Sequence, residues 1–261
     1  MLIDIGVNLT SGQFASDYTE VIERARQAGV EKMIITGTNV PESIQAEKMA
    51  AQQPGCLYST AGIHPHHAKE FEKGSISVLS GLLDKQSVVA VGECGLDYNR
   101  NFSEPADQRC CFSAQLELAA EKNRPVFLHQ RDAHEDFVKL LSEYLPQIPA
   151  AVAHCFTGSA DEMQQYIDMG LYIGITGWIC DERRGQELKS IVNTIPADRL
   201  MIETDAPYLL PRDLQPKPKS RRNEPMYLPH IAEVVASCYG INVIEIAERT
   251  AENTRRFFNL C

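Results

Sequence analysis

Short apolar runs alternate with amphipathic stretches along the whole chain. Three of these stretches carry apolar residues at helical spacing and end at Gly29, Gly170 and Pro196. Eight apolar runs have the length and aliphatic content of buried strands, at residues 2–7, 32–36, 57–62, 88–92, 126–129, 152–154, 171–175 and 200–204. Strands that are apolar on both faces and alternate with helices predict a parallel sheet covered on both sides.

The number of these units indicates how the sheet closes. Eight strand–helix units in 261 residues match a (β/α)₈ barrel, which usually needs about 250 residues. We therefore predict an α/β fold, a TIM barrel forming a single domain over residues 1–261. A doubly wound open sheet is the alternative, because periodicity does not distinguish an open sheet from a closed one. Residues 227–238 and 244–258 are predicted as closing helices, the second capped by Asn242.

Four of the apolar runs end at a side chain that can bind a metal ion or move a proton. These side chains are Glu93, His129, His154 and Asp205. A single histidine at a strand end is more often a structural residue than a ligand. In a parallel barrel, however, all strands end at one face, and active sites are built there. Imidazole and carboxylate ligands suit divalent cations. The pattern predicts a metal-dependent hydrolase.

The charge of the chain limits its partners. A net charge of −10 argues against a protein that coats nucleic acid through overall positive charge. A basic, proline-rich segment nevertheless follows the eighth strand, and we interpret it either as a solvated surface loop or as a substrate-gripping loop. Its cationic residues are Arg212, Lys217, Lys219, Arg221 and Arg222.

Cysteine usage and hydropathy indicate the compartment. The eight cysteines show no Cys-x-x-Cys spacing, which is typical of reduced thiols in a cytosolic protein. No run approaches the ~20 apolar residues of a membrane span, and the N-terminus lacks the basic region of a signal peptide. We expect a cytoplasmic protein without a membrane partner, and a monomer, since nothing in the sequence requires an oligomer.

Six segments resemble the signatures of one enzyme family. In order and spacing they are similar to the TatD family of metal-dependent deoxyribonucleases, rather than only to the wider amidohydrolase superfamily. The resemblance covers essentially the whole chain. The segments are IHPH (63–66), GECGLDY (92–98), PVFLHQRDA (125–133), HCFTG (154–158), GITGW (174–178) and ETDAPYL (203–209).

The resemblance implies a TIM-barrel hydrolase that cleaves phosphodiester bonds of single-stranded DNA, and of RNA, from the 3′ end. It implies that Glu93, His129 and His154 are metal ligands. Asp205 would be a further ligand or the base that deprotonates the attacking water. His64 would contact the scissile phosphate or a metal, with a loop-capping role as the alternative.

Residues near these candidate ligands carry further predictions. Asp97 is a candidate for orienting the ligands, whereas His66 and His67 are expected to be structural. Trp178 and Tyr208 lie where a base could stack, but we expect them to pack in the core.

The first strand departs from the family pattern. Most members of the wider family carry Asp-x-His-x-His there, whereas this chain has Asp4, Gly6 and Asn8 at those positions. Two nitrogen ligands are missing, so we expect a weaker, more oxygen-rich site. That favours Mg²⁺, with Mn²⁺ or Zn²⁺ as alternatives, and one ion instead of two.

Two other functions stay open. The same barrel and metal could hydrolyse an amide or cyclic C–N bond, although the basic segment speaks against a small neutral substrate. Alternatively, the loss of both imidazoles on strand one could mark a catalytically degenerate barrel that acts as a binding protein.

Overall fold

The computed structural model describes residues 1–260. Its strands form one eight-stranded sheet whose spatial order follows the chain from β1 to β8. A doubly wound sheet reverses its strand order at a switch point, so the sequential order confirms the predicted (β/α)₈ barrel class. The strands are β1 (Leu2–Val7), β2 (Val30–Ile35), β3 (Leu57–Ala61), β4 (Val88–Asp97), β5 (Val126–Arg131), β6 (Ala151–Ala153), β7 (Tyr172–Ile175) and β8 (Leu200–Ile202).

Helices follow the strands, and local sequence signals set their ends. Ser159 and Glu162 form a capping box, and the side chain of Asn242, the predicted cap, accepts a hydrogen bond from the Ile244 amide. The helices are α1 (Tyr18–Gln27), α2 (Val40–Gln52), α3 (Lys73–Leu83), α4 (Pro105–Lys122), α5 (His134–Tyr144), α6 (Ala160–Asp168), α7 (Gln186–Ile191), α8 (Leu228–Tyr239) and α9 (Val243–Phe258). Short 3₁₀ turns occur at Gly12–Phe14, Pro65–Glu70, Leu145–Gln147, Gly177–Cys180, Val192–Thr194 and Pro225–Tyr227.

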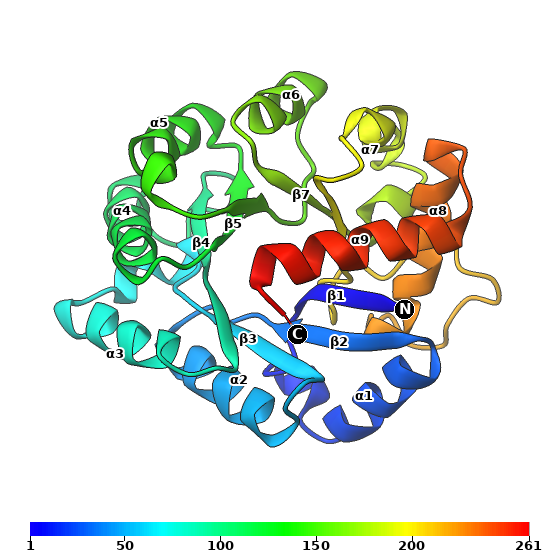
Figure 1. The fold of residues 1–261 in the computed structure, drawn as a ribbon, viewed down its shortest axis with the longest axis horizontal. Helices are drawn as coiled ribbons and strands as arrows, with labels where there is room; N and C mark the ends of the chain where they lie inside the picture. The colour runs from blue at the N-terminus through cyan, green and yellow to red at the C-terminus, as the bar shows by residue number, and fades with distance from the viewer. Residues whose placement is uncertain (261) are drawn as a thin grey trace. The chain divides into compact units, whose positions relative to one another are not determined.

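The chain divides into two compact units. One is continuous, Ile35–His154; the other joins Met1–Ile34 to the segment that starts at Cys155. In the continuous unit, α2 packs against β3, and α4 packs against β4 and α5 (Figure 1). The fully buried rings of Phe112 and Phe137 stack between α4 and α5, with centroids 5.5 Å apart. This apolar layer packs against the strands that carry the candidate ligands.

In the discontinuous unit, strands β1 and β8 are joined by a buried carboxylate. Asp4 on β1 accepts hydrogen bonds from the Thr204 amide at 3.0 Å and from the Thr204 hydroxyl at 2.5 Å. Burial raises the pKa of Asp4 to about 7. Val7 pairs with Ala206 in a parallel bridge, and α9 packs against both strands. The chain therefore brings its first strand beside its last.

Strands β4 and β5 are longer than their apolar runs predicted. Parallel pairing continues past Glu93, through Gly95 opposite His129, to Asp97 opposite Arg131. The expectation that these strands end at Glu93 and His129 is therefore wrong. An apolar run stops at the first polar residue, whereas backbone pairing continues wherever the polar side chains have partners.

Gly95 is required by this pairing. Its φ is +143°, and a Cβ added there would overlap the carbonyl oxygen of His129. We expect Gly95→Ala to lower the free energy of unfolding by about 3 kcal/mol, from overpacking together with an unfavourable φ. Urea denaturation measures this. Gly81→Ala is the matched control, because Gly81 is exposed in α3 with open space around it, and it should stabilise by about 0.5–1 kcal/mol. A Gly95→Ala protein as stable as the parent would contradict the packing argument.

The described residues contain no single helix long and apolar enough to cross a membrane; one pair, Pro225–Tyr239 with Val243–Phe258, passes only when joined across a 107° bend. Seven cysteines are free thiols within residues 1–260. Cys261 lies outside the described residues.

Candidate metal centre

Glu93 owes its position to an irregularity in β4. The register between β4 and β5 shifts between Gly92 and Cys94, which makes Glu93 an extra residue relative to β5, as in a β-bulge. Bulges re-aim side chains and recur beside active sites. Gly92 permits the close approach, since its φ is +136° and a Cβ there would overlap the Phe127 carbonyl oxygen. The Glu93 carboxylate is buried, with 7% of the side chain exposed.

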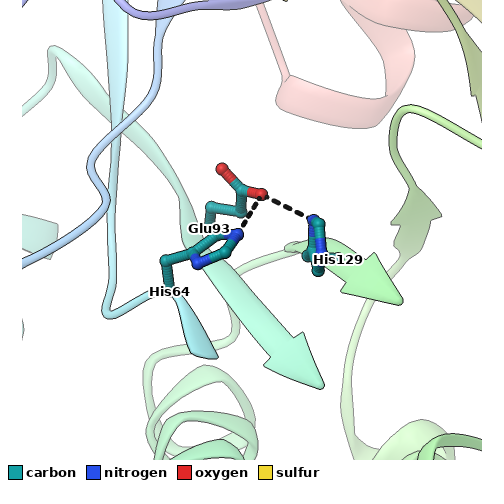
Figure 2. A group of neighbouring side chains, drawn as sticks. All are labelled: His64, Glu93 and His129. Atoms are coloured by element: carbon teal, nitrogen blue, oxygen red, sulfur yellow. Dashed lines mark ion pairs between the residues drawn. The ribbon is translucent and has the colours of Figure 1, made fainter. Parts of the chain in front are cut away.

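Three imidazoles converge on one oxygen of this carboxylate. His64 Nε2 lies 3.2 Å from Glu93 Oε1, and His129 Nδ1 lies 3.1 Å from it. Figure 2 shows these two rings pointing at the carboxylate from different segments. His154 Nε2 is closer still, at 2.7 Å. The histidines lie in the turn after β3, on β5 and directly after β6, and Glu93 lies on β4, so neighbouring parallel strands of one unit bring the four side chains together.

The electrostatics of the cluster favour an ionised carboxylate. Burial alone would raise the pKa of Glu93, but His154, His64 and His129 hold it well below its ordinary value. For His129, burial alone would lower the pKa of the ring. The hydrogen bonds to Asp97 and Glu93 outweigh this effect, so the pKa of His129 is raised. A buried carboxylate surrounded by nitrogen atoms is a site that can hold positive charge.

His64 differs from the other two histidines. Its Nδ1 accepts a hydrogen bond from the His66 amide at 3.0 Å, so the proton of the neutral ring resides on Nε2. Burial lowers the pKa of His64 to about 4, which keeps the ring neutral at physiological pH. His64 is therefore arranged as a hydrogen-bond donor through Nε2.

Asp97 contacts two of the histidines near Glu93. Its Oδ2 lies 3.3 Å from His129 Nε2 and 2.8 Å from His66 Nε2. Its Oδ1 accepts hydrogen bonds from the Asn99 and Arg100 amides. A carboxylate on the second nitrogen of a ligand histidine fixes the ring and its tautomer. His66, which was expected to be structural, thus connects to Asp97; only its two-residue spacing from His64 could have indicated this contact.

Asp205 lies in the other unit, where Asn8 positions it. Asn8 Nδ2 donates a 2.9 Å hydrogen bond to Asp205 Oδ1 and a 3.3 Å bond to the Ala206 carbonyl. The Asp205 amide donates to the Gly6 carbonyl, and its φ is +54°. The Asn8 amide group therefore orients the carboxylate that follows β8.

The basic segment borders a groove of about 770 Å³ within the discontinuous unit. Its lining includes one carboxylate, that of Asp181, and five cationic side chains. The cationic residues are Arg183, Arg184, Arg212, Lys217 and Arg221. The Arg184 guanidinium lies 4.2 Å above the Trp178 ring. A groove with cations and an indole can accommodate a phosphodiester chain with exposed bases.

Two expectations about this region are corrected. Trp178 is only half-buried and lines the groove, and Tyr208 is 54% exposed, so neither belongs to the core; both follow strands, in loops that the core does not cover. Arg222 is a structural residue, because it forms ion pairs with Asp17 and Glu224, both at 2.7 Å.

The residues of the continuous unit suit a divalent cation. Ligand atoms of His64, Glu93 and His129 lie within 4.8 Å of one another, and His154 Nε2 lies 2.7 Å from Glu93. The imidazoles of His129 and His154 can therefore bind a cation beside Glu93, while His64 acts as a hydrogen-bond donor. A buried carboxylate that faces imidazole nitrogens, with a second carboxylate behind one ring, is the usual environment of a catalytic cation. Fold and site together define the class of the metal-dependent barrel hydrolases.

Comparison with known proteins identifies the family. The model of the TatD related DNases matches residues 3–259. A 3′-5′ ssDNA/RNA exonuclease TatD of Erwinia tasmaniensis is 58% identical, over 99% of this chain and 100% of the relative. One of Klebsiella pneumoniae is 56% identical, over 99% and 98%. The chain belongs to the TatD related DNase family.

Solved structures agree with this assignment. YJJV, a TatD homologue of Escherichia coli K12, has a TM-score of 0.88 at 28% identity, over 100% of this chain and 98% of that one. A D-hydantoinase has a TM-score of 0.63 at 10% identity, over 97% and 70%, and shares the fold alone.

Proposed function

We propose that this protein is a metal-dependent nuclease that hydrolyses phosphodiester bonds of single-stranded DNA, and of RNA, from the 3′ end. The observation that carries the proposal is the convergence of three imidazoles on Glu93 Oε1. Its family membership and the printed activity of its relatives support the substrate class.

Glu93, His129 and His154 would hold the cation, with Asp205 as a further ligand. A divalent cation there would stabilise charge on the phosphoryl oxygens and acidify the attacking water. Asp97 keeps the His129 ring in the orientation in which Nδ1 faces Glu93 Oε1, so Nδ1 would be available to a cation held there. Mg²⁺ is the proposed ion; the imidazole nitrogens suit Mn²⁺ and Zn²⁺ as well.

Asp205 and His64 would move protons and hold charge. The position of Asp205 after the last strand of a (β/α)₈ barrel supports a role at the catalytic face. Its carboxylate takes the proton of the attacking water, while Asn8 fixes its orientation. His64 donates its Nε2–H to an oxygen of the scissile phosphate, in keeping with its tautomer.

The groove around Trp178 supports a strand with exposed bases as the substrate. Its cations neutralise backbone phosphates, and the indole stacks on a base, which is available only in a single strand. A small neutral amide would need neither feature.

A cleavage assay tests the proposal. The protein is incubated with 5′-labelled single-stranded DNA, the matching RNA and a blunt duplex, in Mg²⁺, Mn²⁺ or Zn²⁺. We expect products that shorten stepwise from the 3′ end of single strands, little cleavage of the duplex, and no activity in EDTA until the metal is restored. Cleavage that persists in EDTA would refute a metal-dependent nuclease. Activity on a dihydropyrimidine amide without any cleavage of oligonucleotides would favour the C–N hydrolase.

We also propose that residues 1–261 act as one domain and as a cytoplasmic monomer. The family match over residues 3–259 supports one functional unit, and the free thiols suit a reducing compartment. Light scattering coupled to gel filtration measures the mass of the particle.

A further inference from the structure

A second cluster of metal-binding side chains lies in the discontinuous unit. Cys180 ends the turn Gly177–Cys180, Asp213 lies in the loop after β8, and His230 occupies the first turn of α8. One ligand atom from each lies within 4.8 Å of the other two. None of the three belongs to the Glu93 centre, and the proposed hydrolysis uses none of them.

We propose that Cys180, Asp213 and His230 form a separate Zn²⁺ site, with water as the fourth ligand. A thiolate, an imidazole and a carboxylate are all zinc ligands, and together they are too soft for Mg²⁺ and Ca²⁺, which prefer oxygen. Tetrahedral zinc requires four donors, and Asp213 lies at the surface, where water can supply the fourth.

The contacts of His230 fit a metal ligand. Its Nε2 lies 2.7 Å from Asp213 Oδ1, so these two candidate ligand atoms already lie next to each other. Its other nitrogen, Nδ1, lies 3.8 Å from Glu233 Oε2, one helical turn along α8. A carboxylate near the second nitrogen is the usual outer partner of a zinc-bound histidine, because it orients the ring and raises its basicity.

The burial of the three side chains suits a cation that enters from one side. Cys180 is 2% exposed, whereas the side chains of His230 and Asp213 are 26% and 35% exposed. An ion can therefore reach the thiol from the Asp213 side. Burial, with the nearby Asp213 carboxylate, raises the pKa of the Cys180 thiol. Zinc must displace that proton, so binding should release a proton and strengthen as pH rises.

The site would hold the basic loop in place. Cys180 and Asp213 adjoin Asp181 and Arg212, which already form an ion pair at 3.6 Å. Both Asp181 and Arg212 line the groove around Trp178. Zinc would add coordination bonds that connect the basic loop, the Trp178 turn and α8.

Cobalt provides a direct test, because thiolate ligation of Co²⁺ produces a charge-transfer band in the near ultraviolet. EDTA-treated full-length protein is titrated with CoCl₂ and then with ZnCl₂. We expect a saturable band that zinc abolishes. Cys180→Ser should lose the band, while Cys110→Ser, which removes an exposed thiol of α4, should keep it. Asp213→Asn should weaken cobalt binding by at least about 10-fold.

Three results would overturn the zinc site: no band in the parent protein, a band that survives in Cys180→Ser, or unchanged cobalt affinity in Asp213→Asn. The last measurement decides the question even if Cys180→Ser does not fold, since Asp213 is exposed. Glu93→Gln should keep the band, so the outcome is independent of whether the nuclease proposal holds.

Discussion

Glu93→Gln is expected to reduce cleavage of single-stranded DNA by about 10³-fold or more. Glu93 is the point on which His64, His129 and His154 converge, and in the proposed metal centre its carboxylate would supply the negative charge. Glutamine keeps the volume and one acceptor oxygen but removes that charge. Loss of a correctly held cation withdraws several kcal/mol of transition-state stabilisation, and about 4 kcal/mol corresponds to 10³-fold in rate.

Two measurements check this result. Single-turnover cleavage gives the rate, and calorimetry with Mn²⁺ gives the affinity for the metal, which should fall in parallel. Glu70→Gln is the control, because Glu70 is an exposed glutamate of the same unit that pairs only peripherally with His67. Circular dichroism should show that both variants are folded. If Glu93→Gln cleaved DNA at the parental rate, the metal centre would be elsewhere and the degenerate-barrel alternative would gain support.

Asp205→Asn is expected to lower kcat by about 10²–10⁴-fold, the usual contribution of a general base. Asparagine is the appropriate replacement for two reasons. It tolerates the left-handed backbone that Asp205 adopts, and its oxygen can still accept the hydrogen bond from Asn8. What it lacks is the capacity to take a proton. The loss should therefore appear in kcat more than in KM.

A charge-matched control separates this loss from a general effect of removing an acid. Asp198→Asn neutralises an exposed aspartate of the same unit that pairs with its neighbour Arg199, and it should leave kcat within a factor of two or so, as expected for a surface pair. If Asp205→Asn raised KM at constant kcat, Asp205 would be a binding residue and another group would take the proton.

Local signals were sufficient to predict the elements. Each of the eight apolar runs contains or overlaps a strand, and the capping box at Ser159 and the cap at Asn242 begin the predicted helices. These signals act over a few residues, so they can be recognised in the sequence directly. The same reasoning failed at β4, where pairing with β5 extends the strand to Asp97. Strand length depends on the partner, which a local pattern does not contain.

The candidate site was predicted in part. The ends of the apolar runs identified Glu93, His129 and His154, and the structure brings these side chains together around one carboxylate oxygen. The contact of His66 with Asp97 was missed because it joins the turn Pro65–Glu70 to the end of β4, two segments distant in the chain. The part that Asn8 plays was also missed, since an asparagine shows no metal-binding pattern, and its function follows from its distance to Asp205.

The sequence by itself determined the order of strands and helices, the barrel class and the side chains able to bind a cation, because periodicity and chemical type are properties of the residues themselves. Only the tertiary structure decided how these side chains are aimed. The bulge that turns Glu93 toward three imidazoles, the tautomer of His64, and the convergence of Cys180, Asp213 and His230 arise from contacts between segments distant in the chain. Such contacts depend on packing in three dimensions, which no local pattern of residues records.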